Sequence, residues 1–277
     1  MGTFLEKINS MFQIFLKGRV DIVLLYFFII YSFLNIYPPE YKHGIWFAPL
    51  SLALLISAAY LFNKIYDYKE DSITEKSWAL KKKDIYLALV VALSILPLPI
   101  GIIIGHPIKP FVIMYFWGVL LYFFYSFPIG NFRFKKVFLI KNIFAAGAWY
   151  LSIIVLVSAY LEISSFQGVF FHWFYLFLLF LVYEIIWDIK DIKGDKASGV
   201  TTIPNKYGVL TTKVIVAALL VVIFISVSFD IRTIGFLSST YLFLWLIFIS
   251  ERTPIFYYHL IIFGQIALLF VHIAYLR

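Results

Sequence analysis

Residues 183–204 read YEIIWDIKDIKGDKASGVTTIP and follow directly on a long run of Phe, Leu, Tyr and Val. The segment contains four carboxylates spaced by four, three and four residues: Glu184, Asp188, Asp191 and Asp195. On a helix these spacings place all four on one face, which repels itself unless cations neutralise it. Because hard cations prefer oxygen ligands, the pattern predicts a metal site, most simply for Mg²⁺ with a phosphate-bearing ligand.

A second acidic segment repeats this arrangement. In NKIYDYKED, Asn63, Asp67 and Asp71 are again spaced by four residues and again end an apolar run. Together the two segments hold seven of the 15 Asp and Glu residues. The alternative is a pair of solvated helix ends balanced by neighbouring lysines, but solvated ends require no four-residue spacing in two separate places. We therefore expect both segments to face one cation-binding site.

The composition predicts an integral membrane protein. Of the 277 residues, 63% are hydrophobic and 14% are charged, against roughly 25% charged in soluble domains. The apolar segments have the length of membrane-crossing helices, about 20 residues, and lack the alternation of barrel strands. We expect an all-α membrane protein with one domain over residues 1–277, in which residues 1–19 form an interfacial amphipathic segment. Nine transmembrane helices are predicted, at residues 20–38, 45–63, 85–105, 110–128, 139–160, 168–187, 210–229, 233–250 and 255–276.

The distribution of basic residues predicts the orientation of these helices. If the loops alternate sides, 19 of the 23 Lys and Arg residues lie on the side of the amino terminus and of both acidic segments. By the positive-inside rule this side is cytoplasmic, and the carboxyl terminus lies outside. The net charge of +8 is therefore a topology signal and an attraction to the anionic lipid bilayer, and no nucleic acid is expected as a partner. The chain has no cysteine, which excludes disulfides and thiolate chemistry.

Basic residues near the two acidic segments are candidates to bind an anionic ligand. They are Lys81 and Lys82, after the first segment, and Arg133 and Lys135, which follow Tyr125 and Ser126 in YSFPIGNFRFKK. Lysine and arginine both donate hydrogen bonds to phosphate oxygens, and arginine does so in a bidentate way. For each of these cations taken alone, positive-inside topology is the simpler explanation.

Several of these motifs resemble those of the UbiA superfamily of intramembrane prenyltransferases. NKIYDYKED is similar to the first aspartate-rich motif of that family, N-x-x-x-D-x-x-x-D, and DIKDIKGD is similar to its second, D-x-x-D-x-x-x-D. The segments GDKASGVTTIPNKYG and YSFPIGNFRFKKVFLIKN also resemble family segments. After the first motif many members have a segment like N-x-x-x-R-P, whereas this chain has SITEKSWALKKK, with neither Arg nor Pro.

The resemblance implies a fold and a set of site residues. The fold is a bundle of nine transmembrane helices around a central cavity with a cytoplasmic cap, and the ligands are Mg²⁺ and a prenyl diphosphate. Carried onto this chain, the metal ligands are Asn63, Asp67, Asp71, Asp188, Asp191 and Asp195, and Glu184 is added from its spacing alone. The aspartates with Arg133 and Lys135 form the catalytic set, and the substrate-binding set is Asn63, Tyr125, Ser126, Lys81 and Lys82.

The activity implied by the resemblance is Mg²⁺-dependent ionisation of a prenyl diphosphate and transfer of the prenyl group to an aromatic or lipid acceptor. Cationic groups withdraw charge from the leaving diphosphate, and aromatic faces stabilise an allylic cation. A membrane terpene cyclase of the same superfamily would use the same metal site without an acceptor. A polar group in the acceptor pocket would favour transfer, and an entirely apolar cavity would favour cyclisation. A cation-coupled transporter is ranked last, because its carboxylates would lie near the membrane midplane in broken helices.

Other ionisable residues receive no catalytic role from the sequence. The five histidines show no ligand spacing. Arg19 and Asp21 either form a pair at a helix end or line the mouth of the cavity, and the pattern favours the structural role.

Overall fold

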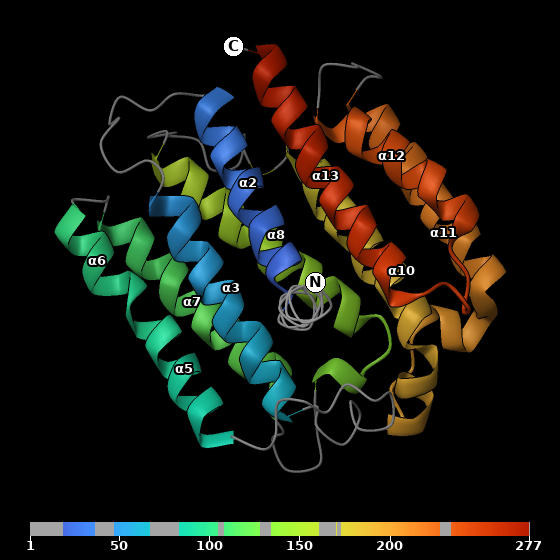
Figure 1. Ribbon diagram of the computed structural model, residues 1–277, viewed down its shortest axis with the longest axis horizontal. Helices are drawn as coiled ribbons and strands as arrows, with labels where there is room; N and C mark the ends of the chain where they lie inside the picture. The colour runs from blue at the N-terminus through green and yellow to red at the C-terminus, as the bar shows by residue number, and fades with distance from the viewer. Residues whose placement is uncertain are drawn as a thin grey trace, which may run out of the picture.

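The computed structural model describes residues 19–36, 47–66, 83–104, 108–127, 134–160, 170, 173–227 and 234–276, and the regular elements within these ranges are all helical (Figure 1). The helices are α2 (Val20–Ile36), α3 (Phe47–Tyr66), α5 (Lys83–Ile95), α6 (Pro97–Ile104), α7 (Ile108–Ser126), η2 (Phe134–Lys136), α8 (Ile140–Tyr160), α10 (Phe174–Ser198), α11 (Ile203–Ser226), α12 (Ile234–Phe248) and α13 (Ile255–Leu276). Each of the nine predicted transmembrane segments overlaps a helix of the structure, and the third segment is divided between α5 and α6. The division falls at Pro97, which lacks the N–H that would continue the hydrogen-bond ladder of α5.

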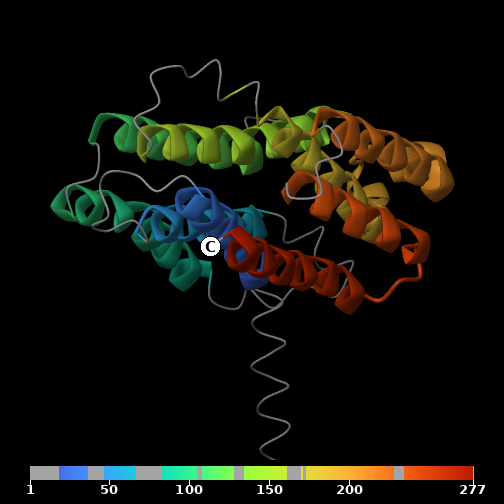
Figure 2. The ribbon, with the colours of Figure 1, turned by 90° about the horizontal axis from the view of Figure 1, so that it is seen from above.

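Most of the helices form a closed ring. Following the chain, α2 packs on α3, α3 on α7, α7 on α8, α8 on α10, α10 on α11, α11 on α12, and α12 on α13, which closes the ring against α2. Figure 2 shows α2 and α13 (blue and red) in one layer and α8 (yellow-green) in the layer that faces them. Helices α5 and α6 pack on α3 at the edge of the molecule, away from α10 (Figure 1). The middle of the ring is therefore enclosed by α2, α3, α7, α8, α10 and α13.

The outer surface of the ring is apolar. Leu210 of α11 and Phe248 of α12 are 77% and 71% exposed, and large apolar side chains on α5 and α7 are exposed as well. A soluble monomer rarely tolerates such surfaces, whereas lipid tails cover them without penalty. Four of the described helices are long and apolar enough to cross a membrane, over Pro49–Tyr66, Ile140–Ser158, Ile203–Ser226 and Ile255–Ala274. The chain is thus an integral membrane protein, and the count of nine transmembrane helices stays a prediction.

A close approach between α12 and α13 supplies a test of this packing. The Tyr241 hydroxyl donates a hydrogen bond to the Leu260 carbonyl at 3.1 Å and lies directly against Gly264, where a Cβ atom would overlap the phenol. Gly264→Ala should lower the thermal unfolding midpoint of the detergent-solubilised protein, because overpacking destabilises a fold by about 1–3 kcal/mol.

Gly147→Ala on α8 is the matched control for that substitution. A Cβ atom at Gly147 would meet Phe177 at 3.9 Å, an ordinary contact. Alanine is favoured over glycine inside a helix by about 1 kcal/mol, so the control should leave the midpoint unchanged or raise it. Equal midpoints for the two variants would contradict the packing of α12 on α13.

Candidate functional site

Helix α10 carries the acidic segment on its carboxyl-terminal half. The helix continues to Ser198, eleven residues past residue 187, where the predicted transmembrane segment ends. It ends because Gly199 adopts the left-handed conformation at φ +71°, and the amide of Val200 donates to the Asp195 carbonyl at 2.9 Å. Glycine adopts this conformation at little cost, since it has no Cβ atom. All four predicted carboxylates therefore lie on one continuous helix, and all four line the same cavity.

This cavity lies inside the helix ring and has a volume of about 660 Å³. The first turns of α2, α8 and α13 meet the last turns of α3, α7 and α10 at one end, since α3 and α7 run in one direction and their ring neighbours α2 and α8 in the other. At that end the charged lining residues are Arg19, Lys64, Lys135, Lys141, Glu184, Asp188, Lys190, Asp191 and Asp195. Toward the other end the lining is apolar, with Leu25, Leu52, Leu55, Leu121 and Phe180. The cavity thus has a charged end and an apolar end.

Lys141, in the first turns of α8, lies between two carboxylates of α10. Its Nζ donates to Asp188 Oδ1 at 2.7 Å and to Asp195 Oδ2 at 3.3 Å. The neighbouring Asn142 donates to Asp188 Oδ2 at 2.8 Å, so both oxygens of this buried carboxylate accept a hydrogen bond. Lys141 and Asn142 were not among the site residues predicted from the sequence. The position of Lys141 within the predicted transmembrane segment 139–160 could have indicated its role, because an ionisable residue inside a membrane segment usually has a functional partner.

The end of the acidic face is less enclosed. Lys190 donates to Asp191 Oδ1 at 2.6 Å, so a second lysine neutralises this face. Asp195 lies beyond the predicted transmembrane segment, and burial raises the pKa of Asp195 to about 6, with Lys141 opposing and Asp188 adding to the rise. A cation bound beside Asp195 would lower this pKa by favouring the charged carboxylate. The acidic face therefore still attracts positive charge.

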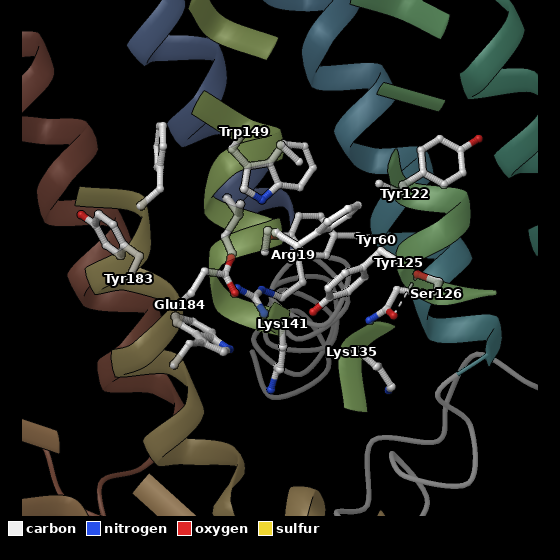
Figure 3. A pocket seen from close by; sticks show the side chains of 18 of the residues that line it. Arg19, Tyr60, Tyr122, Tyr125, Ser126, Lys135, Lys141, Trp149, Tyr183 and Glu184 are labelled. Atoms are coloured by element: carbon white, nitrogen blue, oxygen red, sulfur yellow. Dashed lines mark hydrogen bonds between the residues drawn. The ribbon is translucent and has the colours of Figure 1, made fainter. Parts of the chain in front are cut away.

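Asn63 of the first acidic segment lies next to the Tyr-Ser segment. Ser126 Oγ, at the end of α7, donates to Asn63 Oδ1 of α3 at 3.1 Å. The ring of Tyr125 stacks on Phe144, with centroids 5.9 Å apart, and the buried Lys135 of η2 lines the same cavity. Figure 3 shows Tyr125, Ser126 and Lys135 on one side of the cavity and Glu184 on the other. The structure thus brings these residues to one end of the cavity with the carboxylates of α10.

Five predicted site residues lie outside the part of the chain that the structure describes: Asp67, Asp71, Lys81, Lys82 and Arg133. The predicted interfacial segment lies outside it as well, except for Arg19. Their placement stays a prediction.

Arg19 lies in the wall of the cavity, although the sequence favoured a structural role. Its guanidinium carbon is 4.0 Å from the centroid of the Trp187 ring and 5.3 Å from that of Tyr60. Figure 3 shows Arg19 between Glu184 of α10 and Tyr60 of α3. Arginine over aromatic faces is a favourable cation–π arrangement. The charged end of the cavity therefore includes a guanidinium from the start of α2.

A histidine that the sequence left without a role also lines the cavity. His259 of α13 donates from Nδ1 to Asp21 Oδ2 at 2.7 Å, and both side chains are buried. The residues are 238 positions apart in the chain, so no local spacing could have indicated the pair.

A comparison with protein families identifies the family of the chain. Residues 23–277 match the family model of the UbiA prenyltransferase family. The chain belongs to this family. No curated protein sequence matches the chain.

Solved structures of a UbiA homologue from Archaeoglobus fulgidus are similar to this chain. The structure bound to GPP and Mg²⁺ has a TM-score of 0.63 and 14% sequence identity, covering 94% of this chain and 97% of the homologue. The structure bound to DMAPP and Mg²⁺ has a TM-score of 0.58 and 16% identity, covering 93% and 97%. At these identities the likeness establishes the UbiA fold alone.

The donor set of this UbiA site suits a hard cation. It consists of the carboxylates of α10 and the amide oxygen of Asn63, and Mg²⁺ takes oxygen ligands. Within the described ranges no three acidic or histidine side chains form a ready metal cluster, and the lysines Lys141 and Lys190 contact carboxylates of the acidic face. A cation entering the face would compete with these lysines for the same oxygens.

Removing Lys141 should destabilise the fold. Lys141→Met leaves Asp188 buried without its cation, and breaking a buried ion pair typically costs about 3–5 kcal/mol. The double variant Lys141→Met/Asp188→Asn should recover much of the loss, because it removes the uncompensated charge as well. Thermal unfolding in detergent measures the wild-type protein, Lys141→Met, Asp188→Asn and the double variant.

Lys136→Met is the control, since Lys136 is an exposed lysine close by in the chain. It should leave the unfolding midpoint near that of the wild type. Additive losses in the double variant would show that Lys141 and Asp188 are not coupled.

Proposed function

We propose that this chain is a Mg²⁺-dependent intramembrane prenyltransferase that ionises a prenyl diphosphate and transfers the prenyl group to an aromatic or lipid acceptor. The observation that supports it is the division of one cavity into a charged end and an apolar end. A prenyl diphosphate has the same division, with an anionic head and a hydrocarbon tail. The UbiA homologue from A. fulgidus was solved with two prenyl diphosphates, DMAPP and GPP, each with Mg²⁺.

The metal-binding role falls to the acidic segments. In this proposal the ligands come from Asp188, Asp191 and Asp195, from Asn63, from Glu184, and from Asp67 and Asp71 as the sequence predicts. Magnesium, when bound, supplies positive charge that stabilises the diphosphate as it leaves. Lys135 and Lys141 lie at the same end of the cavity and are placed to donate hydrogen bonds to diphosphate oxygens. Arg133, Lys81 and Lys82 are proposed to add to this set.

Ionisation of the prenyl diphosphate requires side chains around the prenyl group that stabilise an allylic cation. The bond between the prenyl carbon and the diphosphate oxygen breaks, and its electron pair leaves with the diphosphate. Tyr60, Tyr122, Tyr125 and Trp149 line the cavity (Figure 3), and their ring faces attract positive charge. The apolar lining around Leu52 and Leu121 would exclude the water that would otherwise capture the cation.

The polar groups of the cavity wall favour transfer over cyclisation. Arg19 and His259 line the cavity beside the carboxylates, so a polar acceptor would find partners there. An entirely apolar wall would instead have favoured a terpene cyclase. The continuity of α10 through residues 174–198 argues against a transporter, whose ion site would be expected in a broken helix.

The proposed metal site predicts the effect of removing one carboxylate. Asp191→Asn should lower Mg²⁺-dependent diphosphate release by about 100-fold, because a ligand that stabilises the leaving group is lost. The Asp191 side chain is 28% exposed, so the variant should fold. The assay supplies prenyl diphosphates of several lengths to protein in nanodiscs, with Mg²⁺ or a chelator, and identifies products by mass spectrometry. Acceptors are hydroxylated aromatic acids and a lipid extract.

The control for this assay is Asp84→Asn, at an exposed carboxylate of α5 away from the cavity. It should release diphosphate at the wild-type rate. If wild-type protein released no diphosphate from any prenyl length, the proposed function would be wrong.

The proposed orientation is also testable, because the chain contains no cysteine. A single cysteine at Arg252, in the turn between α12 and α13, should react with a membrane-impermeant maleimide only from the cytoplasmic side. A single cysteine at Lys109, at the start of α7, should react only from the outside. The opposite labelling would reverse the sidedness derived from the positive-inside rule.

A further inference from the structure

The proposed function gives no chemical role to the contact between Asp21 and His259. Asp21 has no exposed surface and His259 is 2% exposed, yet both are ionisable and come from the first turns of two adjacent helices, α2 and α13. Buried ionisable groups are costly to keep inside a membrane protein, and such groups usually serve a function. The 2.7 Å contact between Asp21 Oδ2 and His259 Nδ1 fixes the orientation of the imidazole.

This contact determines which ring nitrogen is left to accept a proton. In a neutral imidazole one nitrogen carries the proton and the other accepts one. Nδ1–H donates to Asp21, which leaves Nε2 as the proton acceptor of a side chain that lines the cavity. A carboxylate that holds a histidine in one tautomer and stabilises its protonated form is a recurrent arrangement for a general base.

The surroundings of the pair place it close to the reacting end of the cavity. The rings of His259 and Trp187 are 5.8 Å apart, and Trp187 directly precedes Asp188 of the acidic face. Arg19 lies 3.9 Å from the other oxygen of Asp21, so a positive charge already balances that carboxylate. Other titratable groups around this wall include Tyr26 of α2, Tyr60 of α3, Glu184 and Lys190 of α10, and Tyr258 of α13.

Unsatisfied polar atoms at the same place suggest where an acceptor binds. Arg19 Nε, Asp21 Oδ1 and Trp187 Nε1 are buried and have no hydrogen-bond partner within the described residues. Buried polar atoms are nearly always hydrogen-bonded, so such a group of them requires an explanation. Arg19 and Trp187 both line the cavity, where a polar substrate would satisfy them.

We propose that His259, oriented by Asp21, is the general base that accepts the proton released when the acceptor attacks the prenyl cation. This inference rests on the proposed function and names the fate of one proton in that reaction. The acceptor belongs to the class of hydroxyl-bearing compounds whose reacting oxygen or aromatic carbon carries hydrogen. An electron pair of the acceptor forms the new bond to the prenyl carbon. The bond between the acceptor and its hydrogen then breaks, and the two electrons of that bond stay on the acceptor. The proton moves to Nε2 of His259, and water removes it between turnovers.

Two variants isolate the base while preserving its surroundings. His259→Asn keeps an amide N–H near the position of Nδ1, and Asp21→Asn reverses the hydrogen bond so that the proton moves to Nε2. Each protein is placed in nanodiscs with Mg²⁺, geranylgeranyl diphosphate and 4-hydroxybenzoate, a hydroxylated aromatic acid. The readouts are diphosphate release and the ratio of the acceptor adduct to prenyl alcohol.

Ionisation should persist in both variants, while formation of the acceptor adduct falls by about 100-fold, the contribution typical of a general base. Water then captures the cation, so prenyl alcohol becomes the main product. A merely structural pair would lower release and product formation together and leave their ratio unchanged. His272→Asn, at a second buried histidine of α13 that does not line this cavity, is the matched control and should keep the wild-type ratio.

Three results would overturn the base assignment. These are a wild-type product ratio in either variant, a loss in His272→Asn equal to that in His259→Asn, or unfolding of both variants in thermal scans, which would make the pair structural. A lack of Mg²⁺-dependent release from the wild-type protein is a different result, because it contradicts the proposed function itself and removes the reaction that the base would serve.

Discussion

The ion pairs of Lys141 with Asp188 and Asp195 connect the first turns of α8 to the charged half of α10. Asp188 is buried, and a buried carboxylate without a cation is strongly destabilising. The acidic face can therefore lie inside the helix ring only while a positive charge lies beside it. Lysine supplies that charge in this structure, and the same oxygens are the ones that Mg²⁺ would bind. The interaction that stabilises the fold is thus also the one that ligand binding would rearrange.

The membrane environment explains why the charges gather at one end. Apolar side chains cover the outside of the ring, where lipid replaces water, so charged side chains have stable positions only inside the ring or at the helix ends. Helices of alternating direction bring the start of α8 and the end of α10 to the same level. A cavity that is charged at one end and apolar along the rest follows from this arrangement, and this division suits a ligand with an anionic head and a hydrocarbon tail.

The wall formed by Arg19, Asp21 and His259 adds a second kind of polar chemistry beside the acidic face. Arg19 and Asp21 come from the start of α2, and His259 comes from α13, the last helix of the ring. Closure of the ring between α13 and α2 is what brings them together. The carboxylates of α10 would serve the leaving group, whereas this wall would serve the acceptor, so the two halves of the proposed reaction would use different helices.

The sequence by itself determined the membrane class, the positions of the helices and the acidic face of α10, because these depend on local apolar runs and on spacings within one helix. The sequence also predicted that Asn63, Tyr125, Ser126 and Lys135 belong to the site, because these residues lie in short motifs that can be read directly from the chain. The predicted transmembrane segment ends at residue 187, since hydropathy falls where charged residues begin, whereas α10 continues to Ser198 and Lys141 and Lys190 neutralise its carboxylates. Only the tertiary structure decided that Lys141 lies between Asp188 and Asp195 and that His259 faces Asp21. These contacts join residues far apart in the chain, and their energy depends on burial and distance, which no local pattern specifies.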